Sequence, residues 1–327
     1  MKAKSRERLF AVLPAFLIPL YMVGLILLAN YELVFFAFVV GFPTFLYLLY
    51  LASTIFRATP VKQFSIGIKS IVGGREVDED SLAAVDVLAS LGSSQGRKVM
   101  AVVADGMGGH NKGEVASRIA IREIISGLFS QLGDEALSAV EALKKSFTSA
   151  HREIIAYALD NPECEGMGTT ASAVVTDGKY LNVGHVGDTR VYIVREKEIR
   201  QVTKDHSLVQ EMVDRGEITP QQARRHPKRN VVTRALGAGE KIEVDTYSLP
   251  LPKNSYVLLC CDGLVTELED EEIKDVVLSS PSCQEACEEL IRRAELRRPK
   301  DNVSVIVMGP FEGASAEAKT VVKPKRL

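Results

Sequence analysis

Hydrophobic residues are distributed unevenly along the chain. Two uncharged runs near the N-terminus, 9–29 and 33–56, are separated only by Asn30, Tyr31 and Glu32. About 20 apolar residues suffice for a helix to cross a hydrocarbon core about 30 Å thick. The pattern therefore predicts a transmembrane helical hairpin over 9–56, after a basic N-terminal segment (1–8) and before a linker (57–63).

Basic residues indicate the orientation of this hairpin. Lys and Arg precede the first run and follow the second, and the turn between the runs contains neither. Because cytoplasmic segments carry the excess of basic residues, we expect two spans in the cell membrane with both termini in the cytoplasm. A cleaved signal peptide is the competing interpretation, but it requires a shorter apolar region and no second span.

From residue 64 the pattern changes to short runs of Val, Ile and Ala between turn signals. Strands are predicted at 64–71, 81–87, 98–104, 170–176, 180–186, 190–195, 243–248, 255–261 and 303–308. Apolar residues at helical spacing predict helices at 114–132, 134–159, 270–278 and 282–296. Because strands cluster with strands and helices with helices, we predict an α+β domain with largely antiparallel sheets.

Two segments of this region lack a core pattern. The charged stretch 206–236 contains enough apolar residues to suggest a small helical flap over a site rather than a plain connection. The tail after residue 311 is rich in Ala, Lys and Glu, and we expect it to be mobile. The predicted domain thus spans 64–310, with a tail at 311–327.

Composition narrows the classes of function. The formal net charge of -2 gives no electrostatic footprint for nucleic acid. Five irregularly spaced cysteines favour a reducing compartment over a disulfide framework. Cys260 and Cys261 lie in a predicted buried strand and are interpreted as core. Cys283 and Cys287 are four residues apart on a predicted helix, where buried packing is favoured over a metal pair.

Acidic residues recur at the ends of apolar runs. Asp105 and Asp262 each precede a glycine, Asp188 follows one, and Asp301 opens a strand. Carboxylates gathered at one point repel unless a cation neutralises them, and oxygen ligands suit Mg²⁺ or Mn²⁺. Gly106 would let its carbonyl approach such an ion. Asp-Gly is also a common turn, so structural turns stay open as an alternative.

The residues around these positions carry a resemblance to a known family. Six segments occur in order: 75–80 (Arg-Glu-Val-Asp-Glu-Asp), 105–110 (Asp-Gly-Met-Gly-Gly-His), 168–170 (Gly-Thr-Thr), 187–190 (Gly-Asp-Thr-Arg), 262–264 (Asp-Gly-Leu) and 301–304 (Asp-Asn-Val-Ser). Together they resemble the metal-dependent protein phosphatases (PPM, protein phosphatase type 2C), and with Gly113-Glu114 the prokaryotic branch. The resemblance runs from about 64 to 308 and implies two antiparallel sheets packed as a sandwich and flanked by helices.

The resemblance also implies roles for matching residues. Metal ligation would fall to Asp105 as the bridging carboxylate, the Gly106 carbonyl, Asp262, Asp301, Glu79 through water, Asp80 nearby, and Asp188 with Asp262 at a third, weaker metal. Arg75 would bind the substrate phosphate, for which a planar guanidinium is suited. Two Mn²⁺ or Mg²⁺ ions would then activate a water for in-line attack, without a covalent nucleophile.

Histidines near these motifs allow more than one interpretation. His110 is a candidate general acid, with support of the loop as its alternative role and a metal-bound water as the alternative acid. Eukaryotic members place a histidine where this chain has Met107. His185 lies in an apolar strand and is interpreted as a core residue. His206 stands at the predicted flap entrance, where Asp205 is a candidate helix cap.

These observations predict a membrane-anchored protein serine/threonine phosphatase that acts on the phosphorylated substrates of a Ser/Thr kinase. A phosphatase of a small molecule or a lipid headgroup is an alternative within enzymes. An inactive phosphoprotein-binding scaffold is a further alternative, which the retained Arg75, Asp105, Asp262 and Asp301 disfavour. The sequence does not define an oligomeric state.

Overall fold

The computed structural model describes residues 42–47, 64–91, 94–108, 112–131 and 138–311. The chain divides into two units, residues 1–61 and 62–327. In the first unit only residues 42–47 are described, and they are helical. Within the described ranges, no helix combines the length and apolar character needed to cross a membrane. The predicted spans lie outside the described residues except for 42–47, and the basic N-terminal segment, the whole linker (57–63) and the tail from residue 312 lie outside them too.

The second unit contains two five-stranded antiparallel sheets. One sheet, here called the β1 sheet, has the order β1 (Ser65–Ile71), β10 (Val303–Phe311), β9 (Ser255–Cys260), β6 (Arg190–Arg195) and β7 (Glu198–Gln201). The other, the β2 sheet, has the order β2 (Asp80–Leu91), β3 (Ser94–Met107), β4 (Gly168–Thr176), β5 (Tyr180–Val186) and β8 (Asp245–Pro250).

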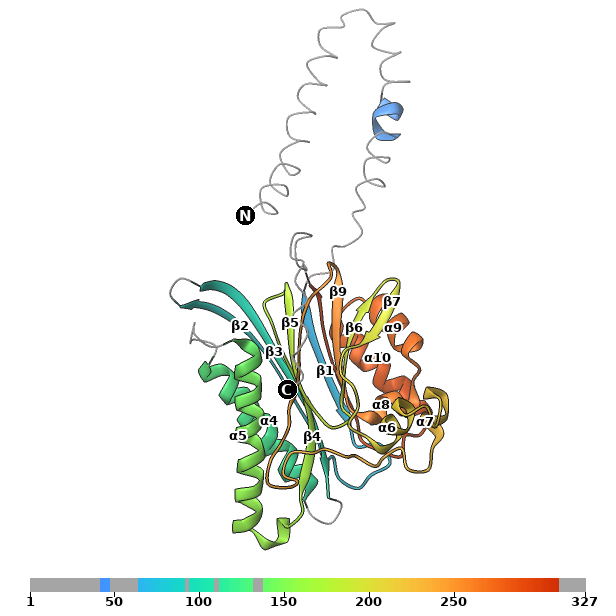
Figure 1. The fold of residues 1–327 in the computed structure, drawn as a ribbon. Helices are drawn as coiled ribbons and strands as arrows, with labels where there is room; N and C mark the ends of the chain where they lie inside the picture. The colour runs from blue at the N-terminus through green and yellow to red at the C-terminus, as the bar shows by residue number, and fades with distance from the viewer. Residues whose placement is uncertain (1–41, 48–63, 92–93, 109–111, 132–137, 312–327) are drawn as a thin grey trace, which may run out of the picture. The chain divides into compact units, whose positions relative to one another are not determined.

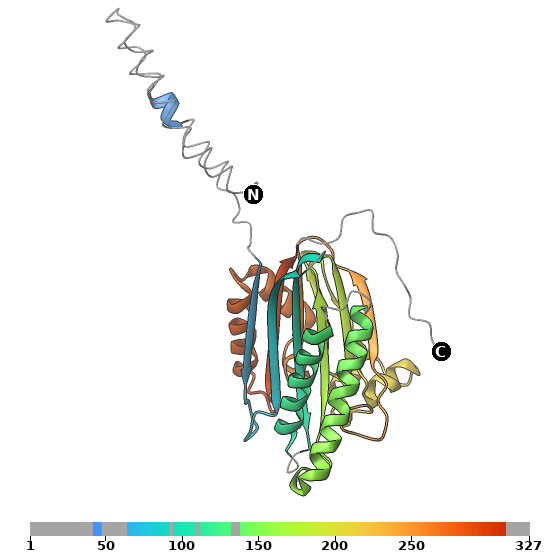
Figure 2. The same ribbon diagram turned by 90° about the vertical axis from the view of Figure 1, so that its left-hand side faces the viewer.

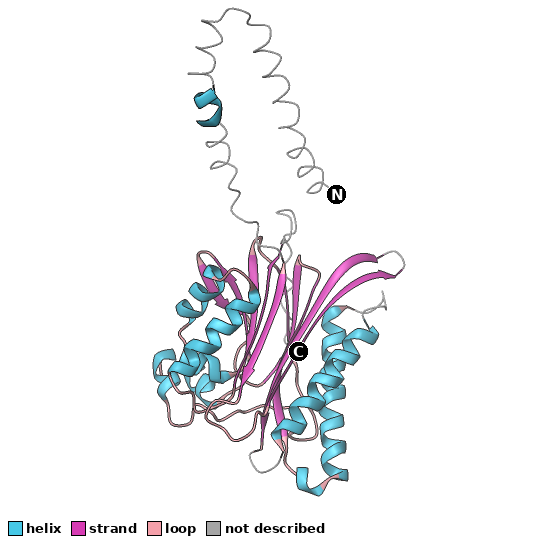
Figure 3. Ribbon diagram, turned by 180° about the vertical axis from the view of Figure 1, so that it is seen from behind, coloured by secondary structure: helices cyan, strands magenta, loops and turns pink. Residues whose placement is uncertain are grey.

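Helices cover the outer face of each sheet, so that the unit has four layers (Figures 1, 2 and 3). The β2 sheet is covered by α4 (Gly113–Gln131) and α5 (Ala139–Asp160). The β1 sheet is covered by α8 (Asp262–Glu267), α9 (Asp270–Ser279) and α10 (Cys283–Leu296). This arrangement confirms the predicted α+β class with antiparallel sheets.

Strand β3 shows why the apolar runs are continuous rather than alternating. Val99, Ala101 and Val103 belong to the core between the two sheets. Met100 and Val102 belong to the core beneath α4 and α5. Because successive side chains of a strand point to opposite faces and both faces are covered, every position is apolar. The same layering explains the unbroken runs in β9 and β10.

Several elements differ from the prediction: β2 extends to Leu91, β3 spans Ser94–Met107, and β10 extends to Phe311. The short strand β7 and the helix α8 were not predicted, and β8 begins at Asp245 instead of residue 243. Helix α5 begins at Ala139 rather than at residue 134, because the Ser138 side chain caps it and pairs reciprocally with Glu141. Asp262 accordingly stands at the first turn of a helix and not in a strand-end turn.

Candidate metal centre

Carboxylates from both sheets line one cavity of about 140 Å³. Its walls are formed by Arg75, Glu79, Asp105, Gly106, Met107, Gly108, Thr170, Asp188, Asn230, Val232, Asp262 and Asp301. The structure therefore brings together seven of the residues predicted for the site. Of the other two, Asp80 is not part of the cavity wall, and His110 lies outside the described residues.

Asp80 and Asp105 face each other across the first pair of strands in the β2 sheet. Burial, followed by repulsion from Asp80, Asp262, Asp188 and Asp301, raises the pKa of Asp105 well above its usual range. Burial raises the pKa of Asp80 to about 7, despite the opposing effect of the nearby Ser304 and Cys261 side chains. Among the residues that the structure describes, none forms a hydrogen bond of good geometry with either carboxylate oxygen of Asp80. Two adjacent, poorly compensated carboxylates favour a cation or protons at this place.

Asp188 and Asp262 approach the cavity from the β5–β6 turn and from α8. Asp188 follows Gly187, which has a φ of 107°. A side chain at position 187 would collide with Thr170, so this turn requires glycine. Burial, then repulsion from Asp262, raises the pKa of Asp188. Burial and the Asp301 carboxylate raise the pKa of Asp262 to about 6. Both groups therefore belong to the same electrostatically crowded site.

Arg75 is the cationic member of the cavity. Its Nη2 donates a hydrogen bond to Asp301 Oδ2 at 2.9 Å, and its Nη1 lies 3.8 Å from Glu79 Oε2. The Arg75 side chain keeps 44% of its surface exposed. A partly exposed guanidinium beside the carboxylates can still reach an incoming anion.

Two glycines allow the backbone to close tightly around Glu79. A Cβ on Gly106 would lie 2.3 Å from the Gly113 carbonyl oxygen and 2.6 Å from that of Glu79. A Cβ on Gly113 would lie 2.7 Å from Glu79 Oε1. Gly113 also opens α4, so the Glu79 carboxylate lies at the positive end of a helix. Gly106 therefore packs against the Glu79 and Gly113 backbone, next to Asp105 in the chain.

These residues fit a hard divalent cation. In the described part of the chain, no three His, Cys, Asp or Glu side chains form a ready-made ligand cluster. The fit rests instead on the unpartnered oxygens of Asp80, the raised pKa of Asp105, and the Gly106–Gly113 cradle. All of the donor atoms are oxygens, which is the ligand chemistry of Mg²⁺ and Mn²⁺.

Sequence reasoning missed the residues that hold this site in shape. The Asn302 side chain accepts from the Glu79 N–H at 2.9 Å and donates to the Val72 and Val77 carbonyls at 2.7 and 3.0 Å. Asn302 therefore fixes the loop that carries Arg75. The Thr169 hydroxyl donates to the Asp105 carbonyl at 2.8 Å. Both residues stood in the quoted motifs, but nothing in one sequence assigns their partners.

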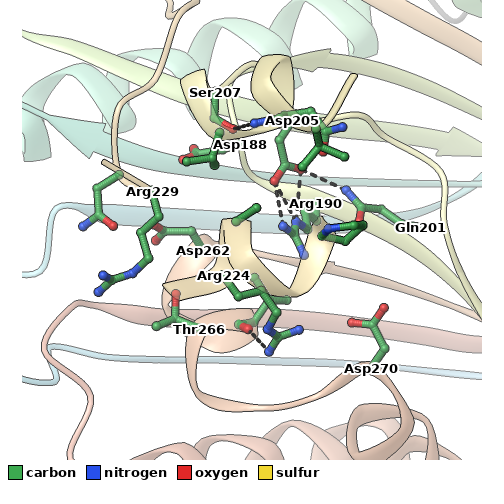
Figure 4. A pocket seen from close by; sticks show the side chains of 17 residues that line it. Asp188, Arg190, Gln201, Asp205, Ser207, Arg224, Arg229, Asp262, Thr266 and Asp270 are labelled. Atoms are coloured by element: carbon green, nitrogen blue, oxygen red, sulfur yellow. Dashed lines mark hydrogen bonds and ion pairs between the residues drawn. The ribbon is translucent and has the colours of Figure 1, made fainter. Parts of the chain in front are cut away.

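Residues 206–236 contain two short helices, α6 (Leu208–Asp214) and α7 (Pro220–Arg225). A cavity of about 280 Å³ lies between these helices, α8 and the β1 sheet (Figure 4). In it, Arg190 Nε and Nη2 donate to the Asp205 carboxylate at 2.7 to 3.1 Å, and Gln201 donates to Asp205 at 2.9 Å. Asp205, the residue directly before the 206–236 segment, is therefore held in place beside Asp188.

His206 joins the start of this segment to the Asp188 turn. The Gly187 N–H donates to His206 Nδ1 at 2.9 Å, and the His206 N–H donates to the Gly187 carbonyl at 2.7 Å. The predicted cap by Asp205 is wrong, because Ser207 caps α6 and Asp205 pairs with Arg190 instead. At the other end, Leu236 exchanges two backbone hydrogen bonds with Thr169.

The remaining histidine and cysteine interpretations are confirmed. His185 is fully buried, lies 2.9 Å from the Ser172 hydroxyl and 3.0 Å from the Lys204 carbonyl, and has its pKa lowered to about 3 by burial. All five cysteines are buried and none forms a disulfide. No thiol is therefore exposed as a nucleophile.

A sandwich with carboxylates from both sheets and an arginine in one cavity defines a hydrolase site for an anionic ester. The family description "Protein phosphatase 2C" matches residues 74–301. A serine/threonine phosphatase stp of Listeria welshimeri is 36% identical over 213 residues, which cover 63% of this chain and 82% of that protein. The Mycobacterium tuberculosis phosphatase PstP is 38% identical over 212 residues, 65% of this chain and 40% of that protein.

Solved structures agree with these sequence matches. The serine/threonine phosphatase Stp1 from Staphylococcus aureus superposes with a TM-score of 0.67 at 30% identity, covering 76% of this chain and 95% of that one. The catalytic domain of PstP in complex with two manganese ions gives a TM-score of 0.62 at 30% identity, covering 77% and 99%. The chain belongs to the protein phosphatase 2C (PPM) family of metal-dependent serine/threonine phosphatases.

Proposed function

We propose that this chain is a membrane-anchored phosphatase that hydrolyses phosphoserine and phosphothreonine in proteins at a centre of two Mn²⁺ or Mg²⁺ ions. The observation that carries the proposal is the single cavity in which Asp105, Asp262 and Asp301 meet the partly exposed Arg75. The names of the relatives supply the class of substrate.

The residues divide the work according to their positions. Asp105 is repelled by the carboxylates of Asp80, Asp262, Asp188 and Asp301, and it would bridge two ions, with Gly106 beside it. Asp262 and Asp301 would complete the shell of one ion. Glu79 would hold water at the other, with Asp80 behind it on the neighbouring strand.

When bound, the two ions supply an activated water near neutral pH and neutralise charge on the phosphoryl oxygens. Arg75 binds and orients the phosphate, because two of its N–H groups can face two phosphoryl oxygens. Its Nη2 holds Asp301, and the exposed part of the guanidinium is accessible to the phosphate.

A third ion and the general acid belong to the same proposal. Asp188 and Asp262 both line the 140 Å³ cavity and the cavity beneath α6 and α7, so together they would hold a weaker third ion. His110 lies in the segment directly after Gly108 and is proposed as a donor to the leaving alkoxide. A metal-bound water is the competing donor.

The anchor is proposed from the two long uncharged runs and the basic residues on either side of them. The phosphatase unit would then face the cytoplasm, where it meets the products of a Ser/Thr kinase. A reporter fused at Leu327 is expected to be accessible only from the cytoplasmic side. External accessibility of that reporter would reverse the proposed orientation.

The enzymatic proposal is tested with the full chain in detergent. Mn²⁺-dependent hydrolysis of an aryl phosphate and of a phosphothreonine peptide is expected, and it should be lost in Asp105→Ala and Asp301→Ala. Absence of hydrolysis with any divalent ion would refute the proposal, and activity that survives both substitutions would refute the site. Hydrolysis of lipid headgroup phosphates, but not of phosphopeptides, would favour the lipid alternative.

A further inference from the structure

A second cavity, of about 210 Å³, lies directly beside the metal-site cavity. The two cavities share Asn230, Asp262 and Asp301. The remaining walls come from the segment after α7, from α8 and from the residues that follow α10: Arg229, Gly263, Thr266, Glu267, Arg297, Arg298, Pro299 and Lys300. Any group bound here is therefore a neighbour of the reacting phosphate.

Three cations of this wall are available to a ligand. Arg298 and Lys300 are exposed and Arg229 is half-buried, and within the described ranges no side-chain hydrogen bond or ion pair occupies them. Arg297 differs, because its guanidinium is held by the Glu267 carbonyl and the Glu272 carboxylate. Figure 4 shows Arg229 beside Asp262, and both residues line this cavity as well as the cavity beneath α6 and α7. We call Arg229, Arg298 and Lys300 the basic pocket.

Arg298 is placed here against the local backbone preference. Helix α10 has its C-cap at Arg297, and Arg298 follows with a φ of 58°. This left-handed conformation after a helix is normally taken by glycine, because a side chain there is crowded. Helix termination alone would therefore favour glycine at position 298, but the chain has an arginine there.

The basic pocket is rigidly connected to Arg75. A Cβ on Gly73 would lie 2.0 Å from the Asp301 carbonyl oxygen, and one on Gly74 would lie 2.7 Å from that of Pro299. The loop before Arg75 is therefore packed directly onto the loop that carries Arg298 and Lys300. An anion in the basic pocket and a phosphate at Arg75 would be held at a fixed separation.

We propose that the basic pocket binds a second anionic group of the phosphoprotein substrate, either an acidic side chain or a second phosphate, beside the residue being dephosphorylated. This proposal rests on the proposed function. Opposite charge selects the ligand: Arg298 and Lys300 make no side-chain hydrogen bond or ion pair within the described ranges, and with Arg229, which faces Asp262, they favour a neighbouring anion on the same peptide. The enzyme would therefore prefer phosphorylated residues in an acidic or multiply phosphorylated context.

The test compares phosphothreonine peptides with the full chain in detergent and Mn²⁺. One peptide has neutral flanks, others carry Glu at each flanking position in turn, and a last set carries phosphoserine at the best of these positions. For the best Glu peptide, kcat/KM is expected to exceed that of the neutral peptide about fivefold to tenfold, which is the effect of a few partly exposed charge pairs. The advantage should shrink in high salt, because exposed charges are screened.

The variants Arg298→Gln and Lys300→Gln are each expected to lower this selectivity ratio about threefold, and the double variant should bring it close to one. Lys253→Gln is the matched control, because Lys253 is an exposed lysine in the β8–β9 turn. It removes the same charge at a distance from the pocket and should leave the ratio unchanged.

Arg298→Gly separates loss of charge from loss of folding. It removes the guanidinium and also relieves the positive φ, so the melting temperature should stay constant or rise by about 1–3 °C while selectivity falls. A wild-type ratio near one, or a ratio that none of these variants lowers, overturns the inference if the aryl phosphate is still hydrolysed. Loss of aryl phosphate hydrolysis overturns the proposed function first. Variants that lose only binding to anionic vesicles would assign the pocket to a membrane surface and overturn the inference.

Discussion

Asn302→Ala is the perturbation that tests most directly how the loop carrying Arg75 is held. The Asn302 side chain is 4% exposed and makes three hydrogen bonds to the backbone of residues 72–79. Each such bond contributes about 1 kcal/mol to stability. Water can replace part of the loss at Val72 and Val77, which are exposed. The expected loss in the free energy of unfolding is therefore about 2–3 kcal/mol.

This loss corresponds to a fall in melting temperature of about 5–10 °C for a unit of this size. Enzymatic activity should decrease more than the loss of stability explains, because the same loop positions Arg75 and Glu79. We expect weaker Mn²⁺ binding and a higher KM for an aryl phosphate at a temperature where the variant is fully folded. Calorimetry, Mn²⁺ titration and steady-state kinetics measure the three effects separately.

Two companion variants sharpen the test. Asn302→Asp keeps the acceptor for the Glu79 N–H but faces two carbonyl oxygens with a carboxylate, so it should be no better than Asn302→Ala. Asn182→Ala removes a comparable strand amide that bonds Ser248 and the Val175 carbonyl in the β2 sheet. It should lower the melting temperature without changing Mn²⁺ affinity. If Asn302→Ala behaves like Asn182→Ala, the positioning role of Asn302 is refuted.

Four further outcomes follow from the same site. Because the pKa values of Asp262 and Asp80 are raised to about 6 and about 7, protons compete with metal, and Mn²⁺ affinity measured by titration should rise with pH over that range. Without metal the sign is opposite: the folded state binds these protons more tightly, so the free energy of unfolding should fall as pH rises from about 4 to about 7. Gly106→Ala brings a Cβ to 2.3 Å from the Gly113 carbonyl oxygen and should weaken Mn²⁺ binding at least about tenfold in the same titration. Arg75→Ala should lower kcat/KM for an aryl phosphate about tenfold to a hundredfold while Mn²⁺ affinity is kept, since a lost charged hydrogen bond to phosphate is worth about 1.5–3 kcal/mol.

The layers of the fold could be predicted because they depend on local patterns. Runs such as 98–104 are apolar on both faces, which requires cover on both sides, and the long helical patterns supplied that cover. The element boundaries that failed depend on specific side-chain hydrogen bonds. Ser138 shortens α5, and Ser207 rather than Asp205 starts α6. Such bonds compete locally and are weakly encoded by periodicity.

The candidate site could be predicted only in its residue types. Strand-end aspartates were visible in the chain, and the structure places Asp105, Asp188 and Asp262 on one cavity. The partners of Asn302 and Arg190 were not predictable, because they join segments distant in sequence or adjacent only after folding. The Glu79 N–H and the Asn302 side chain, for example, are 223 positions apart. Only tertiary structure shows which polar groups satisfy one another.

The repulsion between the carboxylates also explains why the backbone around the site is held by hydrogen bonds from neighbouring side chains. Asp105, Asp188 and Asp262 are held near one another by the fold although their charges repel, which makes the metal-free site unfavourable. Polar groups around them are therefore fixed by bonds that do not use the carboxylates, as Thr169 fixes the Asp105 backbone and His206 fixes the Asp188 turn. Because these bonds fix the backbone, a cation bound at Asp105 or Asp262 relieves repulsion without displacing a hydrogen bond that the described residues make to those two carboxylates.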